Sequence, residues 1–165
     1  RQNKLFIILA MLGLVIGLTA FPSPARAVAG STITVTTNAD ATPNASCSLR
    51  EAITNANNNA ATSADCAGGT GEDTIIFVDG ITTITLGSTL PHITDFDMLT
   101  INGGGDVIIT GSDTYRVFWV ETKLTLDNLT VTHGKCDHCS GGGLVSLGGG
   151  VLYYVVYFYL DRRLG

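Results

Sequence analysis

The chain has 165 residues and a formal net charge of −5, and 14% of its residues are charged. That length fits one small domain. An acidic surface repels phosphate backbones and anionic lipid, so we expect no nucleic acid among the partners of this protein.

Residues 1–29 have the layout of a secretory signal peptide: a basic start, an apolar run over 5–20 and a small-residue cleavage site. The apolar run is shorter than the about 20 residues that a membrane-spanning helix needs, and prolines follow it. We therefore expect cleavage near Val28 or Gly30 and no membrane span in the mature chain; a membrane anchor is the alternative. Loss of three basic residues would change the net charge from −5 to −8.

Residues 48–59 are predicted to form an amphipathic helix. Ser48, followed three residues later by Glu51, is a capping box. Four apolar residues recur at helical spacing behind it: Leu49, Ala52, Ile53 and Ala56.

The four cysteines of an exported chain indicate disulfides before metal ligands. Cys47 and Cys66 flank the helix and its exit. A bond between them would close a loop of about 20 residues and stabilise the fold by about 3 kcal/mol. Cys136 and Cys139 then pair with each other or stay free.

After residue 30, apolar residues alternate with Thr in short stretches such as TITVT at 32–36, which predicts strands with one buried face. Apolar strand residues recur at intervals of 24 or 25: Ile75, Leu99 and Leu124 in one series, Ile84 and Ile108 in another. Such a period favours a coil whose turns stack in parallel over a hydrophobic column. A β-sandwich with hairpin connections is the alternative.

The predicted helix has a place in such a coil. The first turn of a stacked coil has an apolar end and a row of unpaired backbone groups, which promote aggregation unless something covers them. We expect the helix over 48–59 to be that cover. A surface helix with no capping role is the alternative.

Eight stretches, in this order, resemble the N-terminal region of secreted right-handed parallel β-helix proteins that carry the CSLREA motif. They are CSLREAI at 47–53, AN at 56–57, GEDTIIF at 71–77, ITTITLGSTLPHIT at 81–94, LTING at 99–103, IITG at 108–111, RVFWV at 116–120 and LTLDNLTVTHG at 124–134. The resemblance implies a bacterial protein, secreted or on the cell surface, with a pectate-lyase-like fold. Many such relatives are long and adhesin-like, with no assigned activity.

The predicted fold class is therefore all-β: a right-handed parallel β-helix of about three turns over 30–150, with the helix as its N-terminal cap. Residues 151–165, VLYYVVYFYLDRRLG, depart from the family pattern because they lack both the Thr alternation and the turn residues. We interpret them as an atypical tail that arose from a frameshift or a truncated reading.

Two groups of side chains raise the question of chemistry. Five aspartates fit either a calcium or glycan-cleaving site or the capping of turns between strands, and we favour turn capping. They are Asp95, Asp97, Asp106, Asp113 and Asp127. Four residues are weak candidates for a zinc site, against which a disulfide or free thiols are favoured: His133, Cys136, His138 and Cys139. We expect no catalytic residue, no resident metal and no cofactor.

Two further features predict no particular ligand. Arg50 and Arg116 could each contact an anionic sugar, but a solvated face or a contact with turn carbonyls is the more common role of such residues. Outward rows of Thr could bind glycan or ice, but Thr is also a common strand residue. The prediction is an exported scaffold or adhesion module without catalytic activity, with a glycan or another cell-surface ligand as its partner. The alternative is the N-terminal part of a carbohydrate-active β-helix enzyme, a polysaccharide lyase or glycoside hydrolase.

Overall fold

A computed structural model describes residues 29–42, 45–136, 142–146 and 151–159, the last range as backbone alone. The elements in these ranges are, in chain order, β1 (Thr32–Val35), α2 (Leu49–Asn58), β2 (Glu72–Phe77), β3 (Thr83–Thr85), β4 (Met98–Thr110), β5 (Phe118–Val120), β6 (Leu124–Thr132), β7 (Leu144–Ser146) and β8 (Val151–Tyr159). The prediction of a strand-rich chain with one early helix is confirmed for these ranges. The predicted signal peptide lies outside them except for Ala29, as does the end of the predicted tail.

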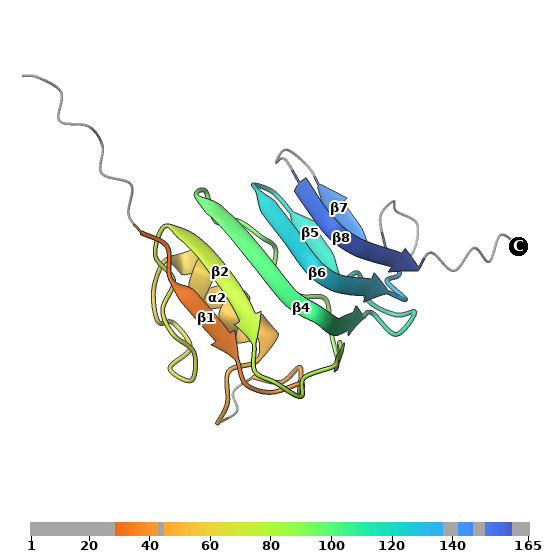
Figure 1. Cartoon of the computed structure of the whole chain (residues 1–165), viewed down its shortest axis with the longest axis horizontal. Helices are drawn as coiled ribbons and strands as arrows, with labels where there is room; N and C mark the ends of the chain where they lie inside the picture. The colour runs from red at the N-terminus through yellow and green to blue at the C-terminus, as the bar shows by residue number, and fades with distance from the viewer. Residues whose placement is uncertain (1–28, 43–44, 137–141, 147–150, 160–165) are drawn as a thin grey trace, which may run out of the picture.

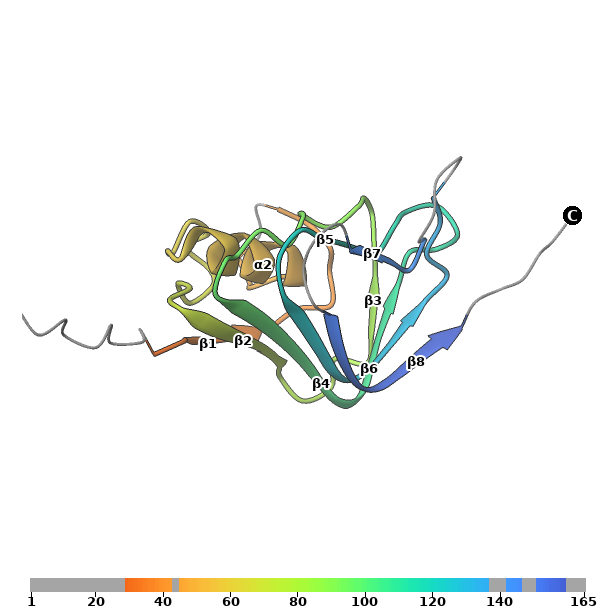
Figure 2. The ribbon, with the colours of Figure 1, turned by 90° about the horizontal axis from the view of Figure 1, so that it is seen from above.

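The described strands all pair in parallel (Figure 1). Six of them form one sheet in the order β1-β2-β4-β6-β8, with β3 beside β4, and β5 pairs with β7 in a second sheet. The long strands bend midway, and β5 and β7 lie across from the bend (Figure 2). On the side of β5 away from β7, Ile93 forms an isolated parallel bridge with Val120. From β4 in the large sheet, the chain passes through β5 in the smaller sheet and returns to the large sheet in β6, which is parallel to β4.

Apolar side chains stack in register across neighbouring strands. Ile33 is paired with Ile75, Ile75 with Ile101, and Ile101 with Leu126, and all four side chains are fully buried. Past the bend, a second buried column has the same form: Ile84, Ile109 and Val131. Full burial of one such side chain contributes about 1.5–3 kcal/mol, so these columns help to hold neighbouring strands together.

The predicted interval of 25 is confirmed for one pair of strands, and the predicted intervals of 24 are wrong by two residues and by one residue for the other two pairs. Leu99 is paired with Leu124, as the interval of 25 implies, but Ile75 faces Ile101 rather than Leu99. A shift of two residues keeps the same side chains on the buried face, so spacing alone does not distinguish these registers. Ile84 faces Ile109 rather than Ile108, which is 37% exposed. In a pair of adjacent isoleucines, the alternation does not say which one is buried.

The bend differs in length between neighbouring strands. The pairs Asn102 with Asp127 and Val107 with Leu129 enclose four residues in β4 but only Asn128 in β6. Asn128 has a φ of 48°, a conformation that Asn tolerates better than most residues. Gly104 and Gly105, with φ of 66° and 104°, allow the longer corner of β4 to loop outward.

α2 lies beside β1 and β2 at the start of the stack (Figures 1 and 2). Its predicted apolar face is buried and belongs to the same core as the strand columns. The residues of that face are Leu49, Ala52, Ile53 and Ala56. In the described ranges, no helix has the length and hydrophobicity that a membrane crossing requires.

Candidate functional site

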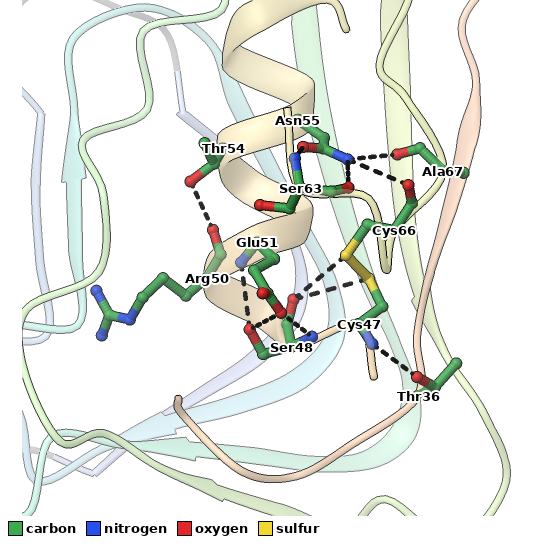
Figure 3. The surroundings of a disulfide bond; sticks show 10 residues. All are labelled: Thr36, Cys47, Ser48, Arg50, Glu51, Thr54, Asn55, Ser63, Cys66 and Ala67. Carbon is green, nitrogen blue, oxygen red and sulfur yellow. Dashed lines mark hydrogen bonds between the residues drawn. A yellow bond between two sulfur atoms is a disulfide. The ribbon is translucent and has the colours of Figure 1, made fainter. Parts of the chain in front are cut away.

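The start of α2 is fixed by the predicted capping box (Figure 3). The Ser48 hydroxyl accepts the Glu51 amide at 3.3 Å, and the Glu51 carboxylate accepts the Ser48 amide at 3.0 Å and its hydroxyl at 2.8 Å. Both side chains are buried, with exposed fractions of 0% and 3%. The negative charge of Glu51 is also favoured at the N-terminus of a helix.

The disulfide between Cys47 and Cys66 is present, so this prediction is confirmed. Both residues are buried at the base of the helix (Figure 3). Cys47 is also tied to the end of β1, because its amide donates to the Thr36 hydroxyl at 2.9 Å and its carbonyl accepts the Thr36 amide at 2.8 Å. The helix start is therefore held by the first strand and by the loop that follows the helix.

Asn55 organises that following loop from inside (Figure 3). Its amide group donates to the carbonyls of Ser63, Cys66 and Ala67 at 3.0–3.3 Å, and its oxygen accepts the Ser63 amide at 2.7 Å. The side chain is fully buried. One polar side chain thus satisfies backbone groups that would otherwise be buried without partners.

Arg50 and Asp40 together bind the backbone of the turn after β3. The guanidinium forms two bonds with the Asp40 carboxylate, at 3.0 and 2.7 Å, and donates to the carbonyls of Ser88 and Thr89 at 2.9 and 2.8 Å. Asp40 in turn accepts the Gly87 amide at 2.8 Å. Of the two interpretations of Arg50, the structure favours the contact with turn carbonyls.

Asn57 likewise binds backbone groups, in the segment over 92–95 that follows this turn. Its side chain donates to the His92 carbonyl at 2.7 Å and accepts the amides of Thr94 and Asp95 at 2.9 and 3.2 Å. On the opposite edge of this segment, Ile93 exchanges backbone hydrogen bonds with the chain around β5. Asn57 therefore occupies the edge that a preceding strand would pair with.

Sequence reasoning missed the roles of Asp40, Asn55 and Asn57. The chain carries several asparagines between residues 55 and 59, and composition does not separate them. The helical spacing predicted correctly that the apolar face is buried, but polar contacts of this kind depend on which backbone segment lies opposite the helix.

Asp95 is the most buried of the five candidate aspartates, with an exposed fraction of 0%. One carboxylate oxygen accepts the Asp97 amide at 3.1 Å, and the other has no hydrogen-bond partner among the described residues. Burial raises the pKa of the Asp95 carboxyl, and the negative charges of Asp73 and Asp97 add to this shift, while the Asp97 amide and the nearby Asn59 side chain oppose it. The turn interpretation fits Asp95, whose carboxylate bonds the backbone two residues on.

Asp97 is exposed just before β4, and Asp113 lies in a turn with a φ of 54°. Asp106 lies in the corner of β4 between Asn102 and Val107, and Asp127 directly precedes Asn128, the corner residue of β6. The prediction that most of these aspartates lie at turns fits these positions.

A cavity of about 280 Å³ lies at the longer corner, between the segment after β2 and the looped part of β4. Its lining includes the partly buried ring of Phe77 and the exposed aspartates Asp79 and Asp106. The backbone of Gly103 and Gly104 forms part of its wall. Sequence reasoning did not identify this cavity, because the segment after β2 and the corner of β4 lie next to each other only in the folded structure.

The weak zinc candidates are only partly described. His133 has a φ of 48° and contacts the Thr132 hydroxyl at 2.8 Å through Nδ1. Cys136 is disulfide-bonded and lies against the guanidinium of Arg116. His138 and Cys139 lie outside the described residues. Across the described ranges, no three His, Cys, Asp or Glu side chains are grouped so as to hold a metal ion.

An aromatic stack forms beside the smaller sheet. The rings of His92 and Trp119 are parallel, with centroids 4.6 Å apart, and the Arg116 guanidinium lies 4.6 Å from the Trp119 ring. Glu121 contacts Nδ1 of His92 at 2.9 Å. Ile93 and Val120 form a parallel bridge and are buried, and the residues just before them, His92 and Trp119, stack in the same register outside the core.

A comparison with protein-family models found no match to the chain, and comparisons with curated proteins and with solved structures found no significant similarity. The site is therefore interpreted from its own contacts.

Proposed function

We propose that this chain is a helix-capped segment of a right-handed parallel β-helix, exported to the cell surface, where it serves as a scaffold or adhesion module without catalytic activity. The parallel strands, the registered apolar columns and the return of the chain through the smaller sheet support the architecture. Each turn of such a coil rests on the one before it.

The observation that carries the proposal is the set of side-chain bonds beneath the first full turn. Asp40, Arg50 and Asn57 bind backbone amides and carbonyls between Gly87 and Asp95, where a preceding turn would otherwise pair. Unpaired edges of this kind recruit other strands. A helix that occupies them is suited to end a stack, and these polar residues thereby serve the integrity of a scaffold.

Export is supported by two independent features. The first 29 residues have the pattern of a signal peptide, and Cys47 and Cys66 form a disulfide, which persists in oxidising compartments. The surface on which such a module acts would carry glycans or other exposed ligands.

The test combines binding and turnover. Purified protein is applied to glycan surfaces and to whole cells, and in parallel is incubated with pectin and alginate. We expect a strand-rich circular dichroism spectrum and binding to one of these surfaces without release of reducing or unsaturated sugar. Sugar release would overturn the non-catalytic assignment, and a spectrum without strand signal would overturn the fold.

A carbohydrate-active enzyme is the second candidate, and the corner cavity favours it. Asp79 and Asp106 both line this cavity together with Phe77, and two carboxylates are the usual catalytic groups of glycosidases. If the cavity is catalytic, Asp79→Asn and Asp106→Asn would each abolish sugar release. Asp113→Asn, at an exposed turn, is the matched control and would leave the release unchanged.

A further inference from the structure

The two ends of the large sheet are unlike each other. β8 pairs with β6 at eight positions, and no strand in the described ranges pairs with its other edge. Its sequence, VLYYVVYFY, contains no charge, no glycine and no proline. A long edge strand without these residues readily pairs with another strand, because its free amides and carbonyls are left without partners.

The opposite end of the stack does not offer a matching edge. β1 has four residues, against nine in β8. On the other sides of the first full turn, Asp40, Arg50 and Asn57 already bind the backbone groups that an incoming turn would need. Head-to-tail stacking of one copy on the next is therefore disfavoured.

We propose that two copies of this chain associate through β8, antiparallel and across a two-fold axis, to form a closed dimer. Like-with-like pairing meets no charge repulsion, since neither strand carries a charge. Along the chain, the nine residues of β8 give a shared edge of about 30 Å, which bends at Val155, the one position of β8 without a partner in the ladder with β6. Each far end of the dimer then carries its own α2, so the assembly stops at two copies instead of growing into a fibre.

The test is the mass of the 165-residue chain in solution, measured by sedimentation equilibrium at several concentrations. We expect twice the mass of one chain. Val155 is the middle residue of β8, so a two-fold axis at the strand centre places it opposite its own copy. Val155→Lys and Val155→Glu should each be monomeric alone, because like charges then meet. An equimolar mixture of the two should regain the dimer mass, which also shows that both variants are folded.

Thr83→Lys is the matched control, because it adds the same charge to an exposed position on β3, which pairs with β4 and not with β8. It should keep the dimer mass. A monomeric parent chain would overturn the proposal, as would a dimer that persists in both Val155 variants. That second result would place the contact elsewhere, for example in the apolar run over 5–20.

Discussion

The side-chain amide of Asn57 brackets Ile93, because it binds the carbonyl of the residue before Ile93 and the amide of the residue after it. A residue of a neighbouring parallel strand makes the same two bonds with its peptide groups. A helical side chain thus replaces one strand residue at the end of the ladder. Arg50 and Asp40 do the same at the turn that precedes this segment.

Replacement of Asn57 by alanine should lower the free energy of unfolding by about 1–3 kcal/mol, because three backbone groups lose their partner. Urea denaturation followed by circular dichroism measures this change. Hydrogen exchange should also become faster at the Thr94 and Asp95 amides, which Asn57 accepts.

Asn58→Ala is the control for this variant, since Asn58 lies in the same helical turn but is exposed and binds only the Thr62 hydroxyl. Its effect should stay within about 0.5 kcal/mol. Equal effects of the two substitutions would mean that the bracketing bonds of Asn57 contribute no special stability.

Asp95→Asn should stabilise the protein at neutral pH. Because burial raises the pKa of Asp95 in the folded state, stability falls as the pH rises from the unfolded value of about 3.9 through the folded pKa. Asparagine keeps the oxygen that accepts the Asp97 amide but carries no charge. The stability gain should therefore disappear below about pH 4, where the carboxyl is protonated in both states. Asp113→Asn, at an exposed turn, is the matched control for the change of residue type. A pH-independent gain in Asp95→Asn would contradict the electrostatic cause.

Removal of the disulfide by Cys47→Ala with Cys66→Ala should cost about 3 kcal/mol, because the closed loop restricts the unfolded chain. Urea titration of the double variant and of the parent chain gives the difference. The control is the same pair of titrations with a reducing agent, which also opens the bond of Cys136 in both chains alike. Both chains should then unfold at the same urea concentration, whereas a clearly more stable reduced parent would indicate that the alanines, not the lost bond, cause the change.

Fluorescence should report on the contact between His92 and Trp119, since Trp119 is the only tryptophan of the chain. The imidazole covers one face of the indole, so its removal in His92→Ala exposes that face to water. The emission maximum of His92→Ala should therefore lie at a longer wavelength than that of the parent chain. Glu121→Gln retains the stack and should keep the parent spectrum; an unchanged spectrum in His92→Ala would mean that the imidazole does not shield the indole.

The export proposal predicts a shortened chain. Expressed in a bacterium with its first 29 residues in place, the protein should appear outside the cytoplasm with an N-terminus near Val28 or Gly30. Mass spectrometry of the purified protein measures this directly. A variant with two arginines in the apolar run over 5–20 should stay uncleaved, and an intact N-terminus on the parent chain would contradict the proposal.

Features set by local chemistry were predictable from the sequence. The capping box at Ser48 and Glu51 follows from residue types three positions apart, and strands follow from alternation with period two. The pairing of Cys47 with Cys66 was predictable because both flank one short helix in an export-type chain. Each of these features involves residues that lie within about 20 positions of each other, so their types and spacing in the sequence were enough to predict it.

The register and the polar contacts of the helix were not predictable in the same way. Whether Ile75 stacks on Leu99 or on Ile101 depends on the number of residues in each corner between the strands. An alternation with period two fits both registers equally well, because they differ by two residues. Asn57 differs from Asn58 only in the backbone that lies opposite, about 35 residues further along the chain. Long-range geometry of this kind follows from the packed structure rather than from composition.

The unequal corners of β4 and β6 have a practical consequence. Strand pairing resumes in register on both sides of the corner although β4 spends three more residues there than β6. The length of the chain at this point is thus independent of the pairing on either side, and no heavy atom lies within 4 Å of a Cβ placed on Gly104 or Gly105. An epitope or a fluorescent tag inserted between these two glycines should be displayed to the outside, which makes this corner a natural position for labelling the protein without disturbing its fold.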